Sequence, residues 1–193
     1  MKILAIDTSS QSASCAVTEE GKLLGEFFTN VKLTHSQTIL PMVENLLEQT
    51  RVALPEIGLF AVTDGPGSFT GLRIGVATAK GLAWPEDKPC APCSTLESMA
   101  WPLAHLEGRV IVCAMDARRS QVYNALFLAA GEGLQRLTPD RAIGLDALAE
   151  ELKNRGKPQI LVGDGAVLCY TTCKELGLDV RLAPPHLRQQ SAW

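Results

Sequence analysis

Histidine, cysteine and positive charge are all scarce in this sequence of 193 residues. Only three histidines occur, at positions 35, 105 and 186, and no two of them are spaced to share one helical turn as a metal-binding pair. Six cysteines are too few for a disulfide scaffold. Eighteen basic residues against 21 acidic ones leave a net charge of −3, which argues against a chain that grips nucleic acid by charge alone. The largest basic cluster is the pair Arg118–Arg119.

Long apolar runs are missing as well. No run approaches the roughly 18 residues that a membrane-spanning helix needs. Asp7 interrupts the first apolar stretch too early for the core of a signal peptide. We therefore expect a soluble, cytoplasmic protein with no membrane association.

Four of the six cysteines form two pairs that could carry chemistry. Cys90 and Cys93 have C-x-x-C spacing, but a redox pair needs Cys90 at a helix N-terminus, and the helix-start signal follows Cys93. Cys169 and Cys173 stand one helical turn apart, and no histidine or carboxylate completes a zinc site beside them. The favoured interpretation of both pairs is that they are small buried residues.

The most informative feature present is an internal repeat. Residues 3–6 form an apolar strand that ends in Asp7, and residues 110–115 form one that ends in Asp116. Each copy continues with a hairpin of two further strands, a helix, a short strand ending in Asp-Gly (Asp64 or Asp164), and another helix. These segments are 13–18, 23–28, 34–50, 59–65 and 70–84 in the first copy, and 122–128, 134–137, 145–154, 160–165 and 166–176 in the second.

Two such copies imply two α/β lobes of like fold, which we place at residues 1–106 and 107–193. In the first lobe, residues 94–106 open with a capping-box pattern and are expected to form a further helix. In the second, a comparable helix would begin at Leu187 and stop within two turns, so we expect this lobe to lack its last helix.

The strongest local motif is the glycine-rich segment at residues 65–75, GPGSFTGLRIG. It is not a P-loop, because no Gly-Lys-Ser/Thr follows, and its third glycine is one residue late for a dinucleotide fingerprint. Two interpretations stay open. Its amide groups could hold an anion at a helix N-terminus, with Ser68 and Thr70 as candidate caps, or its glycines could serve a turn where two backbones pack closely.

The turn after the first strand, at residues 7–10, also has two interpretations, one functional and one structural. Asp7 and the small polar residues after it could orient a hydrated magnesium ion and phosphate oxygens, or could simply make a good turn. The candidate nucleotide-binding residues are therefore Asp7, Thr8, Ser9, Ser10, Gly65, Gly67 and Ser68. The second copy reads Asp116-Ala117-Arg118-Arg119 at this point and lacks the small polar run, which counts against an independent kinase or ATPase.

Two helices of the first lobe are candidates for contact with another protein. The segment at 34–50 has one apolar stripe, opens with a capping-box pattern at Thr34 and contains Pro41, which should kink it or delay its start. The segment at 70–84 is apolar nearly all round, so its outer face needs a partner.

Six segments of this sequence resemble the TsaB (YeaZ) family over nearly the whole chain: LAIDTSS, HSQTILPMVENLL, GPGSFTGLRIGVATAKGLA, STLESMA, MDARRSQVY and VGDGA. The resemblance implies a duplicated actin-like ATPase (RNase H-like) fold, with a mixed sheet flanked by helices in each lobe. Two features depart from the family: Gln121 stands where a glutamate is usual, and the chain ends early.

The resemblance also implies a function. Family members serve the bacterial system that forms N6-threonylcarbamoyladenosine in transfer RNA, as non-catalytic partners of a TsaD-type catalytic subunit, joined by a TsaE-type ATPase. The chain would then have no cofactor of its own, ATP and magnesium would bind where it meets its partners, and it would contact tRNA indirectly. Whether it forms a homodimer alone is left open. We expect the partner surface on the first two helices of the first lobe, at His35, Leu40, Met42, Leu46, Arg73, Ile74 and Leu82.

Two other function classes compete with this one. An actin-fold small-molecule kinase or ATPase is weakened by the unequal turns at Asp7 and Asp116. A glycoprotease-like metallopeptidase is weakened because His35 has no second histidine one turn away.

Overall fold

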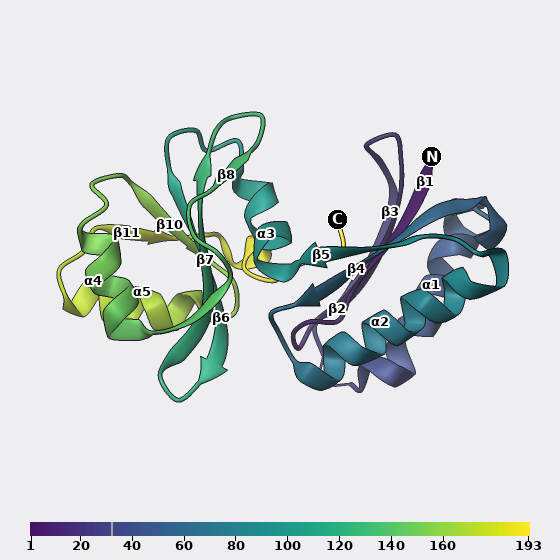
Figure 1. The fold of residues 1–193 in the computed structure, drawn as a ribbon, viewed down its shortest axis with the longest axis horizontal. Coiled ribbons are helices and arrows are strands. Elements are labelled where there is room, and N and C mark those ends of the chain that lie inside the picture. Colours follow the sequence, from purple (N-terminus) through teal and green to yellow (C-terminus); the bar gives the residue numbers. More distant parts are fainter. Residues whose placement is uncertain (32) are drawn as a thin grey trace. The chain divides into compact units, whose positions relative to one another are not determined.

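The computed structural model describes residues 1–31 and 33–193, and this part of the chain divides into two compact units. The first unit consists of residues 1–95 and 190–193, and the second of residues 96–189. Each unit is built on one sheet with helices packed against it (Figure 1).

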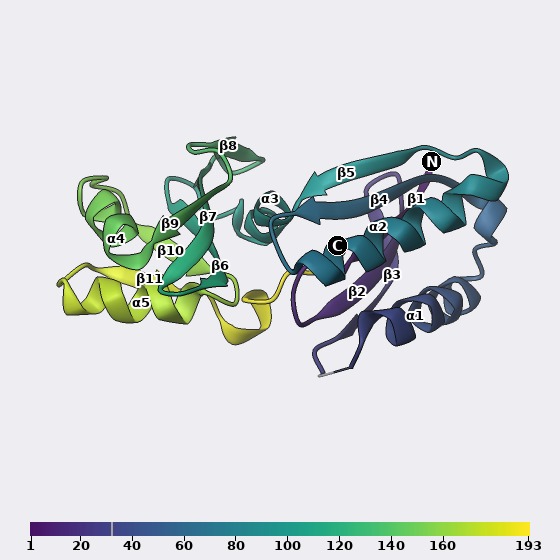
Figure 2. The same cartoon turned by 60° about the horizontal axis from the view of Figure 1, so that its bottom comes forward.

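The first unit holds a five-stranded mixed sheet in the order β3-β2-β1-β4-β5. Strand β1 pairs antiparallel with β2 and parallel with β4. Helices α1 and α2 both pack on one face of this sheet, where their apolar side chains form a single core with those of β1, β2 and β4 (Figure 2). The elements are β1 (Lys2–Asp7), β2 (Ala13–Glu19), β3 (Lys22–Thr29), α1 (His35–Thr50), β4 (Ile57–Gly65), α2 (Phe69–Ala83) and β5 (Cys90–Ser94).

The second unit holds a six-stranded sheet in which β11-β10-β6-β7-β8 follow one another and β9 pairs with the other half of β7. Strand β6 is buried on both faces: Ile111 and Cys113 pack with α3, whereas Val110 and Val112 pack with α4 and α5. The elements are α3 (Thr95–Ala100), β6 (Val110–Arg118), β7 (Gln121–Ala129), β8 (Leu134–Arg136), β9 (Arg141–Gly144), α4 (Leu145–Lys153), β10 (Gln159–Val162), α5 (Ala166–Glu175) and β11 (Val180–Leu182).

The two sheets confirm the internal repeat. The order β8-β7-β6-β10-β11 in the second unit matches β3-β2-β1-β4-β5 in the first, with the same strand directions at the centre. Asp7 is the last residue of β1 and lies opposite Ser14 of β2, and Asp116 lies near the end of β6 opposite Val122 of β7. The two aspartates therefore occupy equivalent places in two like folds.

The division between the units differs from the expected boundary at residues 106 and 107. Leu96, Met99 and Leu103 pack into the core of the second sheet, so α3 belongs with the second unit. Residues 190–193 return to the first unit, where their polar groups bond to β2 and to the turn after β1.

Several local expectations also need correction. Helix α3 ends at Ala100 and gives way to a 3-10 turn over Trp101–Leu103 that contains Pro102, so it does not reach Leu106. Residues 188–193 form no helix. Thr34 is the N-cap of α1, but its side chain accepts no hydrogen bond there, and α1 runs on through Pro41. Strands β9 and β11 were not foreseen, because each is only three or four residues long.

Within the described part of the chain, no helix is both long and apolar enough to cross a membrane.

Candidate functional site

The candidate site of the first unit is centred on Asp7, at the carboxyl end of β1. One carboxylate oxygen of Asp7 accepts hydrogen bonds from the backbone N–H of Ser9 at 2.7 Å and from the hydroxyl of Thr63 at 3.1 Å. The other oxygen is buried and has no partner among the described residues. Burial raises the pKa of Asp7, and the bonds from Ser9 and Thr63 oppose this shift without cancelling it.

The glycine-rich turn packs directly onto the turn that follows Asp7. A Cβ atom on Gly67 would lie 2.4 Å from the carbonyl oxygen of Ser9, and one on Gly71 would lie 2.1 Å from that of Thr8. The amide of Ser68 donates to the Ser9 carbonyl at 2.6 Å, and the Ser68 hydroxyl accepts from the amide of Gly71 as the N-cap of α2. These contacts support the interpretation that the glycines permit close packing, since two of the amides that could face an anion are already bonded.

Residues 190–193 form hydrogen bonds with polar side chains at this turn and on the neighbouring strands β2 and β3. The side-chain amide of Gln190 donates to the Ser9 hydroxyl at 3.1 Å, and the backbone amide of Ala192 donates to the Ser14 hydroxyl at 2.9 Å. The Ser191 hydroxyl bonds to the carboxylate of Glu26 on β3. Burial raises the pKa of Glu26. The structure thus brings Asp7, Ser9 and the glycine-rich turn together, and it adds residues 190–193, which the sequence did not place there.

The equivalent turn of the second unit is exposed and carries two arginines beside two aspartates. The carboxylate of Asp116 accepts from the amide of Arg118 at 2.7 Å, and that of Asp164 accepts from the amide of Asp116 at 3.2 Å. Arg118, Arg119 and Ser120 all have left-handed backbone angles, with φ of 69°, 51° and 57°. Each such residue other than glycine costs roughly 1 kcal/mol or more, so surrounding contacts must hold this turn.

The cysteines occupy structural positions. Cys169 and Cys173 are buried on α5, and burial raises the pKa of Cys169 to about 12, which disfavours the thiolate. Cys90 and Cys93 lie half-buried on β5, ahead of α3 rather than at its start. Among the residues that the structure describes, no group of three or more His, Cys, Asp and Glu side chains is placed to hold a metal ion.

The expected partner surface on α1 and α2 is only partly exposed. Leu40 is 44% exposed, but Met42 and Leu46 are buried in the core of the first unit, so their side chains are not available to a partner. Both lie on the stripe of α1 that faces the sheet, which is the physical reason for this correction.

The remaining expected surface residues divide between core and solvent. Ile74 and Leu82 are half-buried against the core. Arg73 is exposed and its guanidinium stacks 3.8 Å above the ring of Phe69. His35 is half-buried, and its Nε2–H donates to the carbonyl oxygen of Ser10 at 2.7 Å, which ties the start of α1 to the turn after Asp7.

Two exposed aromatic side chains were missed from the sequence. Phe69 is 69% exposed at the start of α2, and Trp84 is 85% exposed just after its end. Both lie at the ends of a helix that is apolar nearly all round, where periodicity does not distinguish a buried position from an exposed one.

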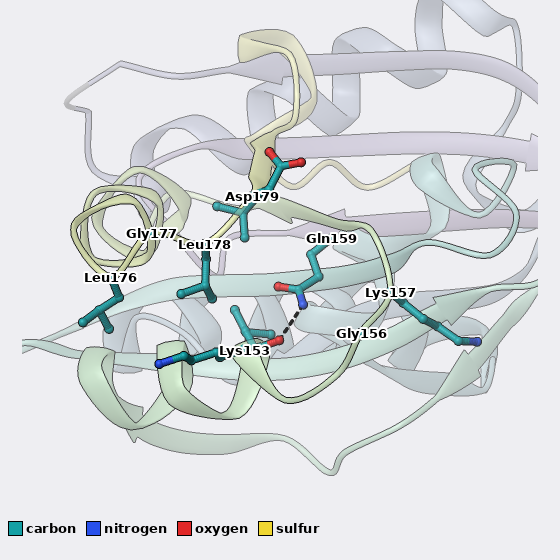
Figure 3. Close-up of a pocket in the computed structure, with 10 residues that line it drawn as sticks. Lys153, Gly156, Lys157, Gln159, Leu176, Gly177, Leu178 and Asp179 are labelled. Atoms are coloured by element: carbon teal, nitrogen blue, oxygen red, sulfur yellow. Dashed lines mark hydrogen bonds between the residues drawn. The ribbon is translucent and has the colours of Figure 1, made fainter.

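A separate pocket of about 270 Å³ lies in the second unit, where α4 and α5 both end (Figure 3). The side-chain amide of Gln159 donates to the carbonyl oxygen of Leu152 at 2.7 Å, while its own oxygen is buried without a partner among the described residues. Leu176 and Leu178 line one side, and the charged ends of Lys153 and Lys157 extend away from the centre. A single trapped water would satisfy the amide oxygen, so this pocket supports no functional assignment.

Comparison with known proteins shows that this chain is similar to proteins of tRNA threonylcarbamoyladenosine biosynthesis. Residues 23–173 match the family model TsaD, described as tRNA N6-adenosine threonylcarbamoyltransferase. The chain is 38% identical to the tRNA threonylcarbamoyladenosine biosynthesis protein TsaB of Bacillus subtilis over 163 residues, which are 84% of this chain and 71% of that protein.

Solved structures agree with this result. YeaZ from Pseudomonas aeruginosa superposes with a TM-score of 0.83 at 25% identity, covering 99% of this chain and 86% of that one. The ROK hexokinase from Thermus thermophilus superposes with a TM-score of 0.51 at 10% identity, covering 94% and 92% of the two chains, and so shares the fold alone.

Proposed function

Because this chain belongs to the TsaB (YeaZ) family of tRNA threonylcarbamoyladenosine biosynthesis proteins, we propose that it is a non-catalytic subunit that pairs with and supports a TsaD-type catalytic subunit. It acts in the cytoplasm, and a TsaE-type ATPase joins the assembly. The chain reaches tRNA within that assembly. Any ATP and magnesium in use bind where the subunits meet.

The observation that carries the non-catalytic role is the packing at the turn after Asp7. Phosphate-binding turns of actin-like enzymes must leave backbone amides and small hydroxyl groups free for the nucleotide. Here the Ser68 amide bonds to Ser9, and the Ser9 hydroxyl bonds to Gln190. A nucleotide at this turn would have to displace both contacts, which supports a structural role for the turn.

The surface proposed for the TsaD-type partner is the exposed side of α1 and the start of α2. Phe69 and Arg73 supply an aromatic ring and a stacked guanidinium, two residue classes that are enriched in protein interfaces, and Leu40 adds an exposed aliphatic side chain. His35 fixes the start of α1 against the turn after Asp7, so this surface is held by hydrogen bonding as well as by packing.

Reconstitution from purified components tests the proposed function. Threonylcarbamoyl transfer to tRNA should require this chain together with a TsaD-type subunit, and should fail with either one alone. Transfer by this chain without a TsaD-type subunit, or full activity in its absence, would overturn the proposal.

Nucleotide binding separates this function from the kinase alternative. A kinase of actin-like fold should bind ATP tightly as an isolated chain, whereas a supporting subunit with an occupied turn should bind it weakly or not at all. Calorimetric titration of the isolated chain with ATP and magnesium measures the difference directly.

A further inference from the structure

The β6–β7 hairpin of the second unit carries two adjacent arginines whose side chains stabilise no other part of the described structure. Arg118 and Arg119 are exposed, and neither side chain makes a hydrogen bond or an ion pair with the described residues. Three other arginines of this unit are held by carboxylates: Arg136 by Glu97 and Asp140, and Arg141 and Arg155 by Glu151. Figure 1 shows this hairpin extending past α4 and α5 of its own unit. The pair is therefore available to an external ligand.

The backbone beneath the two arginines is fixed in an uncommon conformation. Arg118 pairs with Gln121 across the hairpin, which leaves Arg119 and Ser120 as a two-residue loop with positive φ at both positions. Loops of this kind favour asparagine and glycine, because those residues accept left-handed angles at little cost.

Contacts on both sides hold this loop in place. The Asp116 carboxylate accepts from the Arg118 amide at 2.7 Å, and the Ser120 carbonyl accepts from the Leu145 amide at the start of α4 at 3.1 Å. Strained residues held by their surroundings are characteristic of ligand-binding positions. The loop is thus pre-organised to present two guanidinium groups side by side.

We propose that Arg118 and Arg119 form a phosphate-binding site of this subunit. A guanidinium group matches the oxygens of a phosphate with parallel donors, and two such groups can engage one phosphate or two neighbouring ones. The proposal rests on the proposed function, which supplies two sources of phosphate: the backbone of tRNA and the polyphosphate chain of a nucleotide.

Two carboxylates lie beside the hairpin arginines. Asp116 and Asp164 each bond to a backbone amide of the hairpin, and their charges offset much of the attraction that the arginines exert on a single anion. Binding therefore depends on direct hydrogen bonds from the guanidinium groups to phosphate oxygens, and each such contact with a polyanion releases bound counterions.

The test uses this chain assembled with its TsaD-type partner. The double variant Arg118→Gln/Arg119→Gln removes both charges and keeps polar side chains at the hairpin. The matched control Lys157→Gln/Arg181→Gln removes two exposed charges elsewhere in the same unit. Circular dichroism and pairing with the partner verify that both variants are folded and assembled.

Binding of labelled tRNA and of a fluorescent ATP analogue is then measured across a salt series. If tRNA supplies the phosphate, the hairpin variant should bind tRNA roughly tenfold more weakly, with a salt slope lower by about two, and the control should match wild type. If the nucleotide supplies it, the same loss should fall on the ATP analogue and tRNA binding should be unchanged.

Equal behaviour of the hairpin variant and the control toward both ligands would overturn the phosphate site. The proposed function fails on a separate result, namely that transfer activity does not need this chain. The two failures are therefore distinguishable.

Discussion

The glycines of the turn before α2 show how single residues set the shape of the first unit. Gly71 lies in the first turn of α2 and is buried against the backbone of Thr8, whereas Gly81 lies near the end of the same helix and is exposed. The first glycine permits a contact between two backbones, and the second makes no contact that a methyl group would disturb.

Replacing Gly71 with alanine should destabilise the protein by about 2–3 kcal/mol, because the new methyl group would lie 2.1 Å from the Thr8 carbonyl oxygen and the backbone would have to move. Gly81→Ala is the matched control. It has open space and should stabilise the helix by about 0.5–1 kcal/mol. Urea unfolding of the two variants measures both effects, and a Gly71→Ala variant as stable as wild type would show that Gly71 does not pack tightly against Thr8.

Asp7 should make stability depend on pH in an unusual direction. Its pKa is raised by burial in the folded chain, so the folded state binds a proton more tightly than the unfolded state. Above the unfolded pKa of about 3.9, this group therefore contributes less stability as the pH rises.

We compare the free energy of unfolding of wild type with that of Asp7→Asn. The difference, wild type minus variant, should fall between pH 4 and neutral pH by at most about 1.4 kcal/mol for each pH unit. Asparagine keeps an acceptor for the Ser9 amide and the Thr63 hydroxyl. Denaturant unfolding at several pH values checks this expectation. A difference that rises with pH would show that Asp7 is instead stabilised as a carboxylate.

Among the helices, α1 packs one side against the core of the first unit, and Leu40 is exposed on another side. Leu40→Glu should leave the fold intact and weaken pairing with a TsaD-type subunit by tenfold or more, since it places a charge in an apolar interface. Ile74→Glu is a less clear test, because Ile74 also packs against the core.

Leu168→Glu on α5 is the control for Leu40→Glu, because Leu168 is 43% exposed on a helix of the other unit. Affinity measurement of both variants against the purified partner gives the comparison. Equal pairing by Leu40→Glu and Leu168→Glu would remove α1 from the proposed interface.

A polar network joins α4 to β7 and β9. Arg141 on β9 donates to the side-chain oxygen of Asn124, which is fully buried on β7, and also bonds to Glu151 on α4. Arg141→Met leaves the Asn124 oxygen without this donor and should cost about 1–3 kcal/mol of stability. Lys153→Met removes only an exposed ion pair on α4 and should change stability by less than about 0.5 kcal/mol. Thermal unfolding distinguishes the two variants.

At the scale of the whole molecule, the chain returns at its C-terminus to the unit where it began. Residues 190–193 bond to Ser9, Ser14 and Glu26, although about 165 to 181 residues of sequence separate the partners. The first unit is therefore completed only after the second has been traversed.

Deleting residues 190–193 should lower the stability of the first unit by about 1–2 kcal/mol, because these bonds are lost. Hydrogen exchange should locate the effect: amides of β2 and β3 should lose protection, and amides of α4 and β10 should not. Unchanged exchange in β2 and β3 would show that this segment contributes nothing to the first unit.

The duplicated α/β fold and the equivalent places of Asp7 and Asp116 could be predicted from the amino-acid sequence alone. Alternating and helical apolar patterns are local, and they repeat in the same order in both halves. The family followed from contiguous motifs for the same reason. Strands β9 and β11 were missed, since three or four residues carry little pattern, whereas the equally short β8 was predicted from its place in the repeat.

Which of these residues are accessible depends on how the elements pack against one another. Met42 and Leu46 belong to the core while Leu40 faces solvent, because the angle at which α1 meets the sheet selects the buried stripe. The glycine-rich turn closes onto Ser9 rather than standing open, and Gln190 reaches the same serine. Arg118 and Arg119 are held in a left-handed turn by Asp116 and Leu145. Such contacts depend on distances between segments far apart in the chain, which no local pattern encodes.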